Sequence, residues 1–279
     1  MPLSATVDDE LVCGPLMDDG AWSRLRGRSI LLQPCGHPAF PRVSRLGTRH
    51  FVHERDCGSH APESQEHLHL KALVARAVAQ AGWSAATEVP GEGFIADVMG
   101  IRDGARVAFE VQKSRQVLRE YERRQATYAA AGVRAVWLVA KVPPGYQAAE
   151  HLPLFTVTDW LADPRVIVTG RTIAVNRLVG QLLAGSCRWR DVVPSTGAAV
   201  ETMRLLCPMC GDLREVGVSR WLRGTCACGL PVIRQMRSGD DEYRRTCCGY
   251  WGPAIALGRR TAGRTAGDPI TAGHWCLSA

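Results

Sequence analysis

Two strand-like runs give the clearest indication of the fold, and they lie in residues 94–114, which read FIADVMGIRDGARVAFEVQKS. Apolar residues dominate 94–99 and 106–112, and the glycines between these runs predict a turn. An acidic residue interrupts each run, at Asp97 and at Glu110. A carboxylate in a buried strand costs free energy unless it is paired or binds a cation. Both acids are therefore candidate functional residues.

Helices and further strands are expected on both sides of these runs. Residues 63–82 carry an apolar stripe at helical spacing, and 115–131 form a second predicted helix. Three more strand-like runs are expected, at 83–89, 133–140 and 154–157. The order helix, three strands, helix, strand predicts an α/β fold in which helices flank a mixed sheet.

The composition is that of a globular protein. The chain has 279 residues, of which 46% are hydrophobic and 22% are charged. No apolar run approaches the roughly 18 residues that a membrane span needs, and the acidic N-terminus does not resemble a secretory signal. We therefore expect a cytoplasmic protein with no membrane partner.

Shifts in composition divide the chain into five expected segments. They are an N-terminal ribbon-like module without clear periodicity (1–62), an α/β core (63–160), a helical extension and linker (161–200), a cysteine-rich C-terminal module (201–257) and a flexible tail (258–279).

Strand geometry brings further polar groups to the two acids. Side chains alternate along a strand, so Glu110 and Gln112 share one face. Two carboxylates at the ends of neighbouring strands suit a hard divalent cation, which can activate water and stabilise charge on a phosphate. The alternative is that Asp97 and Glu110 are solvent-facing acids at strand ends.

The motifs of residues 35–157 resemble those of CoiA-like competence proteins. They are 49–53 (RHFVH), 63–71 (ESQEHLHLK), 95–98 (IADV), 109–114 (FEVQKS), Arg124 with Tyr128, and 136–138 (VWL). The resemblance implies a PD-(D/E)xK restriction-endonuclease-like fold for the core. It also implies metal-dependent DNA cleavage, in proteins that handle incoming single-stranded DNA during transformation.

The resemblance assigns roles to particular residues. Asp97 and Glu110 would hold Mg²⁺ (or Mn²⁺), and Gln112 takes the place of the motif lysine. A glutamine supplies no charge, but it can orient water or a phosphate by hydrogen bonding. An acid of the first helix often completes such a site, and either Glu63 or Glu66 could do so.

Basic residues indicate a polyanionic partner, since the formal net charge is +7. Arg115, Arg119 and Arg123 are spaced i, i+4, i+8 on the second predicted helix, where they could follow a DNA backbone. The alternative is a solvated helix face. Arg124 and Tyr128 form another i, i+4 pair, which in the nuclease interpretation contacts phosphate or a catalytic acid.

Eleven cysteines in a chain with no export signal indicate metal ligands or buried thiols. Zinc-ribbon spacing at the C-terminus predicts a structural Zn²⁺ site made of Cys207, Cys210, Cys226 and Cys228. A second Zn²⁺ site in the N-terminal module could use Cys35, His37, His53 and Cys57. The resembled family opens this ribbon with one further cysteine, which is missing here.

The function that these patterns favour is a Mg²⁺-dependent deoxyribonuclease-like activity on DNA, with single-stranded DNA as a candidate substrate. The expected context is DNA processing or recombination during transformation. Two alternatives stay open, a non-catalytic DNA-binding module and a zinc-scaffolded adaptor for recombination proteins.

Overall fold

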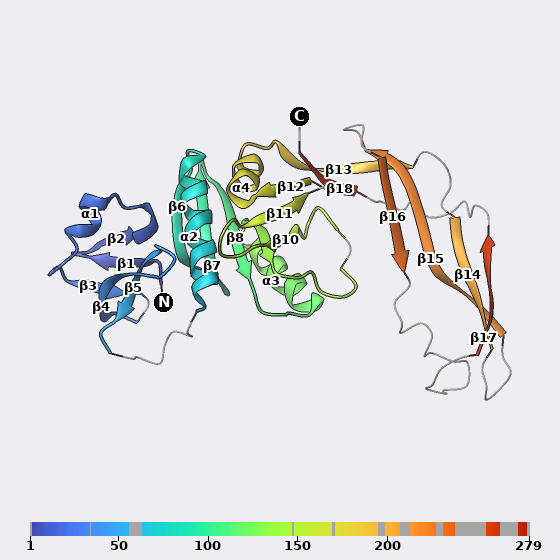
Figure 1. The fold of residues 1–279 in the computed structure, drawn as a ribbon, viewed down its shortest axis with the longest axis horizontal. Helices are drawn as coiled ribbons and strands as arrows, with labels where there is room; N and C mark the ends of the chain where they lie inside the picture. The colour runs from blue at the N-terminus through green and yellow to red at the C-terminus, as the bar shows by residue number, and fades with distance from the viewer. Residues whose placement is uncertain are drawn as a thin grey trace. The chain divides into compact units, whose positions relative to one another are not determined.

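The protein is represented by a computed structural model that describes two units (Figure 1). The described residues are 2–33, 35–55, 63–146, 148–168, 171–194, 199–206, 213–226, 231–237, 255–262 and 273–277. The first unit comprises residues 1–188 and 275–279, and the second comprises 189–274.

A mixed sheet forms the centre of the first unit, with the strand order β12-β11-β10-β9-β8-β7-β6. Its strands are β6 (Ser84–Gly91), β7 (Phe94–Arg102), β8 (Ala105–Gln112), β9 (Arg134–Val139), β10 (Leu154–Thr158), β11 (Arg165–Val168) and β12 (Arg171–Ala174). The pairs β8–β9 and β9–β10 are parallel, and the remaining pairs are antiparallel. The prediction of a mixed sheet is confirmed.

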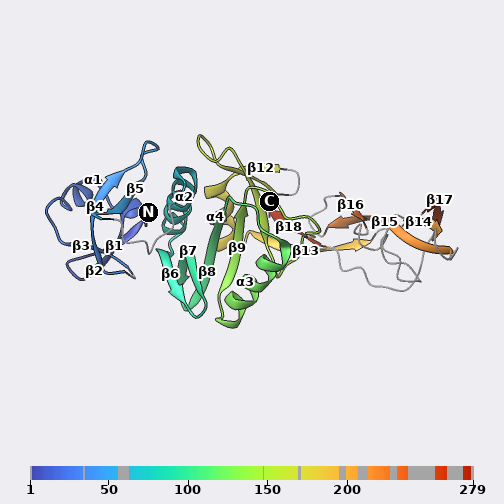
Figure 2. The same ribbon diagram turned by 90° about the horizontal axis from the view of Figure 1, so that it is seen from below.

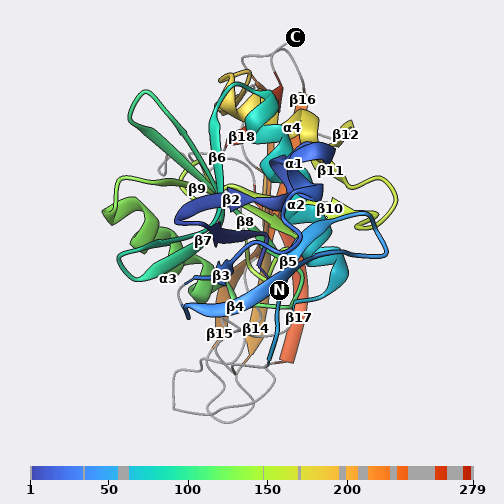
Figure 3. The same cartoon turned by 90° about the vertical axis from the view of Figure 1, so that its left-hand side faces the viewer.

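Three helices flank this sheet, namely α2 (Gln65–Gln80), α3 (Leu118–Ala130) and α4 (Val175–Leu183). Figures 2 and 3 show α2 and α4 on one face of the sheet and α3 on the other. The α3 face holds an aromatic core in which the Tyr121 ring meets the Trp137 ring edge-on at 5.1 Å. Within the described residues, no helix is long and apolar enough to cross a membrane.

Helix α2 begins and ends at residues whose chemistry explains its bounds. Its N-cap is Ser64, whose hydroxyl accepts the His67 N–H at 3.2 Å. The helix therefore begins two residues after Glu63, where the sequence analysis expected it to begin. It ends before Gly82, which has a φ of +77° and lets the chain turn into β6.

The N-terminal module is an antiparallel sheet with the order β2-β1-β3-β4-β5. Its elements are β1 (Ser4–Val7), β2 (Glu10–Cys13), η1 (Gly14–Leu16), α1 (Asp19–Ser23), β3 (Ile30–Leu32), β4 (His37–Val43) and β5 (Arg49–His53). Buried apolar residues such as Leu32 and Phe51 form its core. This regular sheet differs from the irregular module that the sequence analysis expected, because strands of three to seven residues are too short to show a clear period.

The second unit contains an antiparallel sheet with the order β17-β14-β15-β13, and β16 pairs with β15. Its strands are β13 (Cys187–Pro194), β14 (Ala199–Leu206), β15 (Leu213–Cys226), β16 (Pro231–Arg237) and β17 (Ile255–Ala262). Part of the expected tail is also a strand, β18 (Gly273–Leu277). Its residues from Trp275 onward belong to the first unit, where the Trp275 ring lies 5.8 Å from the Phe155 ring between centroids.

Candidate active site

Strands β7 and β8 separate where their two acidic residues lie. The ladder reaches the pair Val98–Phe109. Beyond it, the Asp97 N–H donates to Glu110 Oε1 at 3.3 Å, and the Val111 N–H donates to Asp97 Oδ2 at 2.8 Å. Each carboxylate thus accepts a backbone N–H of the opposite strand, which satisfies both amides and fixes both side chains.

The Glu110 side chain faces α3 and is only 2% exposed. The Tyr128 hydroxyl donates to its Oε1, and the Arg124 guanidinium donates to its Oε2. The same guanidinium lies 4.6 Å from the centroid of the Trp137 ring. Burial and, next, the negative charge of Asp97 raise the pKa of Glu110 to about 7.

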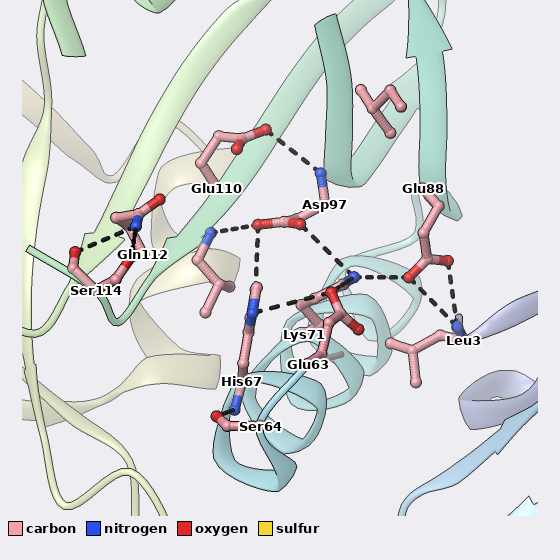
Figure 4. A network of polar contacts seen from close by, with 12 residues as sticks. Leu3, Glu63, Ser64, His67, Lys71, Glu88, Asp97, Glu110, Gln112 and Ser114 are labelled. Atoms are coloured by element: carbon pink, nitrogen blue, oxygen red, sulfur yellow. Dashed lines mark hydrogen bonds and ion pairs between the residues drawn. The ribbon is translucent and has the colours of Figure 1, made fainter. Parts of the chain in front are cut away.

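The Asp97 side chain faces α2, as Figure 4 shows. Its Oδ2 lies 3.5 Å from His67 Nε2, and its Oδ1 lies 3.6 Å from Lys71 Nζ. Burial alone would raise the pKa of Asp97. The Lys71 charge, with His67 and the Val111 N–H, outweighs burial and holds this pKa below its usual value.

Lys71 is a buried cation at the centre of the acidic groups, with 1% of its side chain exposed. Its Nζ lies 2.9 Å from Glu63 Oε1 and 2.7 Å from Glu88 Oε1. Burial alone would lower the pKa of Lys71, but the charges of Glu88, Asp97 and Glu63 raise it above its usual value.

Neither Lys71 nor Glu88 was predicted from the sequence as a site residue. The sequence does contain a signal for Lys71, because it is a charged residue between Leu70 and Ala72 in a largely apolar helix. A buried lysine requires an anionic partner, so its position predicts nearby carboxylates without saying which ones.

Glu63, His67 and Asp97 form the group of described residues that could hold a metal ion, since their ligand atoms lie within 4.8 Å of one another. His67 Nε2 is buried, and Asp97 Oδ2 lies 3.5 Å from it. Two carboxylates suit Mg²⁺ or Mn²⁺, and an imidazole shifts the preference toward a transition ion such as Mn²⁺. The residues present therefore fit a divalent cation.

The structure separates the other predicted site residues from this group. Glu66 lies beside Lys113, with 3.2 Å between Oε1 and Nζ, so Glu63 is the first-helix acid near Asp97. The Gln112 amide nitrogen donates to the Ser114 carbonyl and hydroxyl oxygens, at 3.1 and 2.5 Å. Glu110 is not in the metal-holding group, because its two oxygens bind groups from α3 and the Asp97 N–H.

The arginines predicted to bind DNA differ in position. Arg124 and Tyr128 contact Glu110, as described above. Arg115 precedes α3, so the expected single helical face of Arg115, Arg119 and Arg123 is wrong. All three side chains are exposed, and Arg123 pairs with Glu120 at 2.7 and 2.9 Å.

The predicted zinc ligands are only partly within the described residues. In the N-terminal module, Cys35 Sγ lies 3.2 Å from His53 Nε2, and the His37 and His53 rings are 6.2 Å apart. The fourth predicted ligand of that site, Cys57, lies outside the described residues. Cys226 ends β15, whereas Cys207, Cys210 and Cys228 also lie outside them.

A mixed sheet between helices, with acidic side chains where two central strands separate, defines an α/β domain with a candidate cation site. Residues 63–156 match the family described as competence protein CoiA, nuclease-like domain. The resemblance to CoiA-like competence proteins is thus confirmed for residues 63–156.

Two further comparisons add little. A search of curated proteins finds no match. One solved structure, the SPO1766 protein of unknown function from Silicibacter pomeroyi, is 21% identical in sequence. The match covers 44% of this chain and 84% of that one, with a TM-score of 0.29.

Proposed function

We propose that the domain at residues 63–156 hydrolyses phosphodiester bonds in DNA, with a divalent cation bound by Glu63, His67 and Asp97. The observation that carries this proposal is the convergence of these three ligand groups inside a domain that matches a nuclease-like family. The family description further supports a role in DNA processing during transformation. Single- and double-stranded DNA are both candidate substrates.

Several residues of the chain would have distinct roles around the cation. When bound, a divalent ion polarises the phosphate and lowers the pKa of a coordinated water. Lys71 compensates the carboxylate charge and orients Glu63 and Asp97 through its ion pairs. Glu110 holds the Asp97 backbone in place. Since Ser114 binds the Gln112 amide nitrogen, the amide oxygen is the group that would orient water.

DNA itself would be held by exposed cations of the same domain. Arg115 and Arg119 are exposed, and guanidinium groups bind phosphate well. Such contacts release counterions, so DNA affinity should fall as salt concentration rises.

A second candidate function is DNA binding without cleavage. Lys71 already neutralises part of the acidic group, and Gln112 supplies no charge at the position of the motif lysine. Both observations favour a domain that keeps the fold and binds DNA but lacks catalysis.

A cleavage assay on the full chain separates these functions. End-labelled single- and double-stranded DNA is incubated with Mn²⁺, Mg²⁺ or EDTA. The matched variants are Asp97→Asn and Asp103→Asn, since Asp103 is 93% exposed in the β7–β8 turn and asparagine tolerates its φ of +50°. Losing a metal ligand removes several kcal/mol of transition-state stabilisation, roughly 10³-fold in rate.

We expect metal-dependent cleavage by the wild type and by Asp103→Asn, and loss of cleavage in Asp97→Asn. Full activity of Asp97→Asn, or cleavage that persists in EDTA, contradicts the proposed site. DNA binding by the wild type without any cleavage establishes the second function instead.

A further inference from the structure

Glu88 lies directly opposite Asp97 across strands β6 and β7. The neighbouring ladder pairs are Thr87–Val98 and Val89–Ala96, which place Glu88 and Asp97 at the same level. Glu88 has a φ of +52°. A left-handed conformation in a non-glycine residue costs free energy and persists only where surrounding contacts stabilise it.

The Glu88 carboxylate connects two parts of the first unit, as Figure 4 shows. Its Oε1 lies 2.7 Å from Lys71 Nζ, and both of its oxygens accept the Leu3 N–H at 3.3 Å. Lys71 in turn contacts Asp97 and Glu63. A continuous chain of polar contacts therefore leads from Leu3 to the candidate metal ligands.

Leu3 is held firmly by the N-terminal module. Its carbonyl oxygen accepts the Gly14 N–H at 2.9 Å, and the carbonyl of the preceding Pro2 accepts the Phe51 N–H at 3.0 Å. The module thereby fixes the position of the Leu3 backbone N–H that Glu88 accepts.

The Leu3 side chain also contacts the helix that carries Lys71. It is fully buried against Leu68 and Ala72 of α2, which lie three residues before and one residue after Lys71. On the strand side, the Ser4 hydroxyl bonds the Thr87 hydroxyl, next to Glu88. The N-terminal module therefore packs on α2 and hydrogen-bonds to β6, the two elements whose side chains form the Lys71–Glu88 ion pair.

We infer that Glu88 is a positioning residue through which the docked N-terminal module sets the place of Lys71, and so the cation affinity of Glu63, His67 and Asp97. This inference rests on the proposed function. The Lys71 ammonium repels a divalent cation. It already bonds Glu63 Oε1 at 2.9 Å, but Glu88 holds it 3.6 Å from Asp97 Oδ1, beyond hydrogen-bond distance. Without the Glu88 charge, Lys71 would bind Asp97 more closely and compete with the cation.

The test measures Mn²⁺ affinity of the full chain by electron paramagnetic resonance, with no DNA present. Glu88→Gln keeps an oxygen that can accept the Leu3 N–H but removes the charge. Loss of a residue that supports metal ligands typically weakens binding about 10–100-fold, which is the expected rise in Kd. The matched control is Glu92→Gln, an exposed acid in the adjoining β6–β7 turn, with an unchanged Kd.

Loss of a negative charge weakens cation binding directly, so a second variant keeps every charge. Leu3→Ala removes the packing on α2 but retains the backbone N–H. A substitution that acts on a site only through intervening contacts typically changes affinity by about 2–30-fold, and we expect the Kd for Mn²⁺ to rise by that factor. Its control is Leu25→Ala, a buried leucine in the module's own core, with the wild-type Kd. Thermal unfolding confirms that each variant is folded at the assay temperature.

The outcomes separate the two proposals. Mn²⁺ binding by the wild type together with unchanged affinity in folded Leu3→Ala overturns this inference and leaves the proposed function intact. Unchanged Mn²⁺ affinity in Glu88→Gln also overturns this inference and leaves the proposed function intact. A wild-type protein that binds no Mn²⁺ overturns both.

Discussion

Glu110 and Asp97 illustrate how a single residue's surroundings set its role. Glu110 faces α3, where Arg124 and Tyr128 bind its two oxygens. Asp97 faces α2, beside His67 and Lys71. The two acids are linked through backbone N–H groups, so Glu110 helps to hold Asp97 and lies outside the group of three residues whose ligand atoms converge.

The raised pKa of Glu110 predicts a pH-dependent stability in EDTA. In the unfolded chain this carboxyl ionises near its ordinary pKa of about 4.3, whereas in the native protein burial and the charge of Asp97 raise that pKa to about 7. Between these values the native state binds more protons, so the free energy of unfolding falls as pH rises and levels off above about pH 7. The expected fall is about 2–3 kcal/mol.

Urea unfolding between pH 5 and pH 8 measures this effect. Glu110→Gln should flatten the profile, because glutamine does not titrate. Glu122→Gln, which changes an exposed acid on α3, the helix that Glu110 faces, should keep the wild-type profile. Equal pH profiles for Glu110→Gln and the wild type would show that Glu110 is not the responsible group.

At the scale of elements, the first turn of α2 positions the candidate metal site. Ser64 caps this helix by accepting the His67 N–H, and His67 is one of the three residues that could hold a metal. Glu63 directly precedes the cap and is held by Lys71, two turns further along the helix. The start of one helix thus fixes two of the three ligand groups.

Removing this cap should weaken both the helix and the site. Ser64→Ala deletes the side-chain acceptor, which costs about 1 kcal/mol and lowers the melting temperature by roughly 2–4 °C for a unit of this size. Ser64→Thr keeps a capping hydroxyl and should stay close to the wild type. Calorimetry and Mn²⁺ titration of both variants check the prediction. Equal melting temperatures and equal Mn²⁺ affinities for Ser64→Ala and Ser64→Thr would contradict it.

At the scale of the whole molecule, the candidate metal site and much of the positive charge lie in different parts of the sequence. The candidate site lies in the first unit. Residues 203–279, most of which belong to the second unit, contain 11 arginines and six acidic residues. Because a polyanion is attracted to such an excess of cations, we expect this region to add to DNA affinity.

Zinc binding near the C-terminus stays a prediction from cysteine spacing. Elemental analysis of the full chain should find Zn²⁺, and Cys207→Ser or Cys226→Ser should each lose one zinc per chain, because a tetrahedral site needs all four ligands. Cys13→Ala changes a thiol outside the predicted sites and should keep the wild-type content. Unchanged zinc in both serine variants would refute the C-terminal site.

Much of the first unit's fold could be predicted because its signals are local. The α2, β7 and β8 segments were recognisable from apolar spacing and from the glycines and prolines that end them. Asp97 and Glu110 were recognisable as charges within apolar runs. The N-terminal sheet was not recognisable. Its strands are short, and they pair residues far apart in the sequence, such as Thr6 with Leu31, which no local pattern connects.

The order of elements in residues 63–157 and the acids at the β7–β8 junction follow from the sequence, because periodicity and buried charge are properties of neighbouring residues. Which groups meet depends on how the whole chain packs. Register alone would place Asp97 and Glu110 on one face, but the ladder is interrupted there and their side chains turn to opposite helices. Lys71, Glu88 and Leu3 converge from three separate elements, and such long-range contacts exist only once the chain has packed.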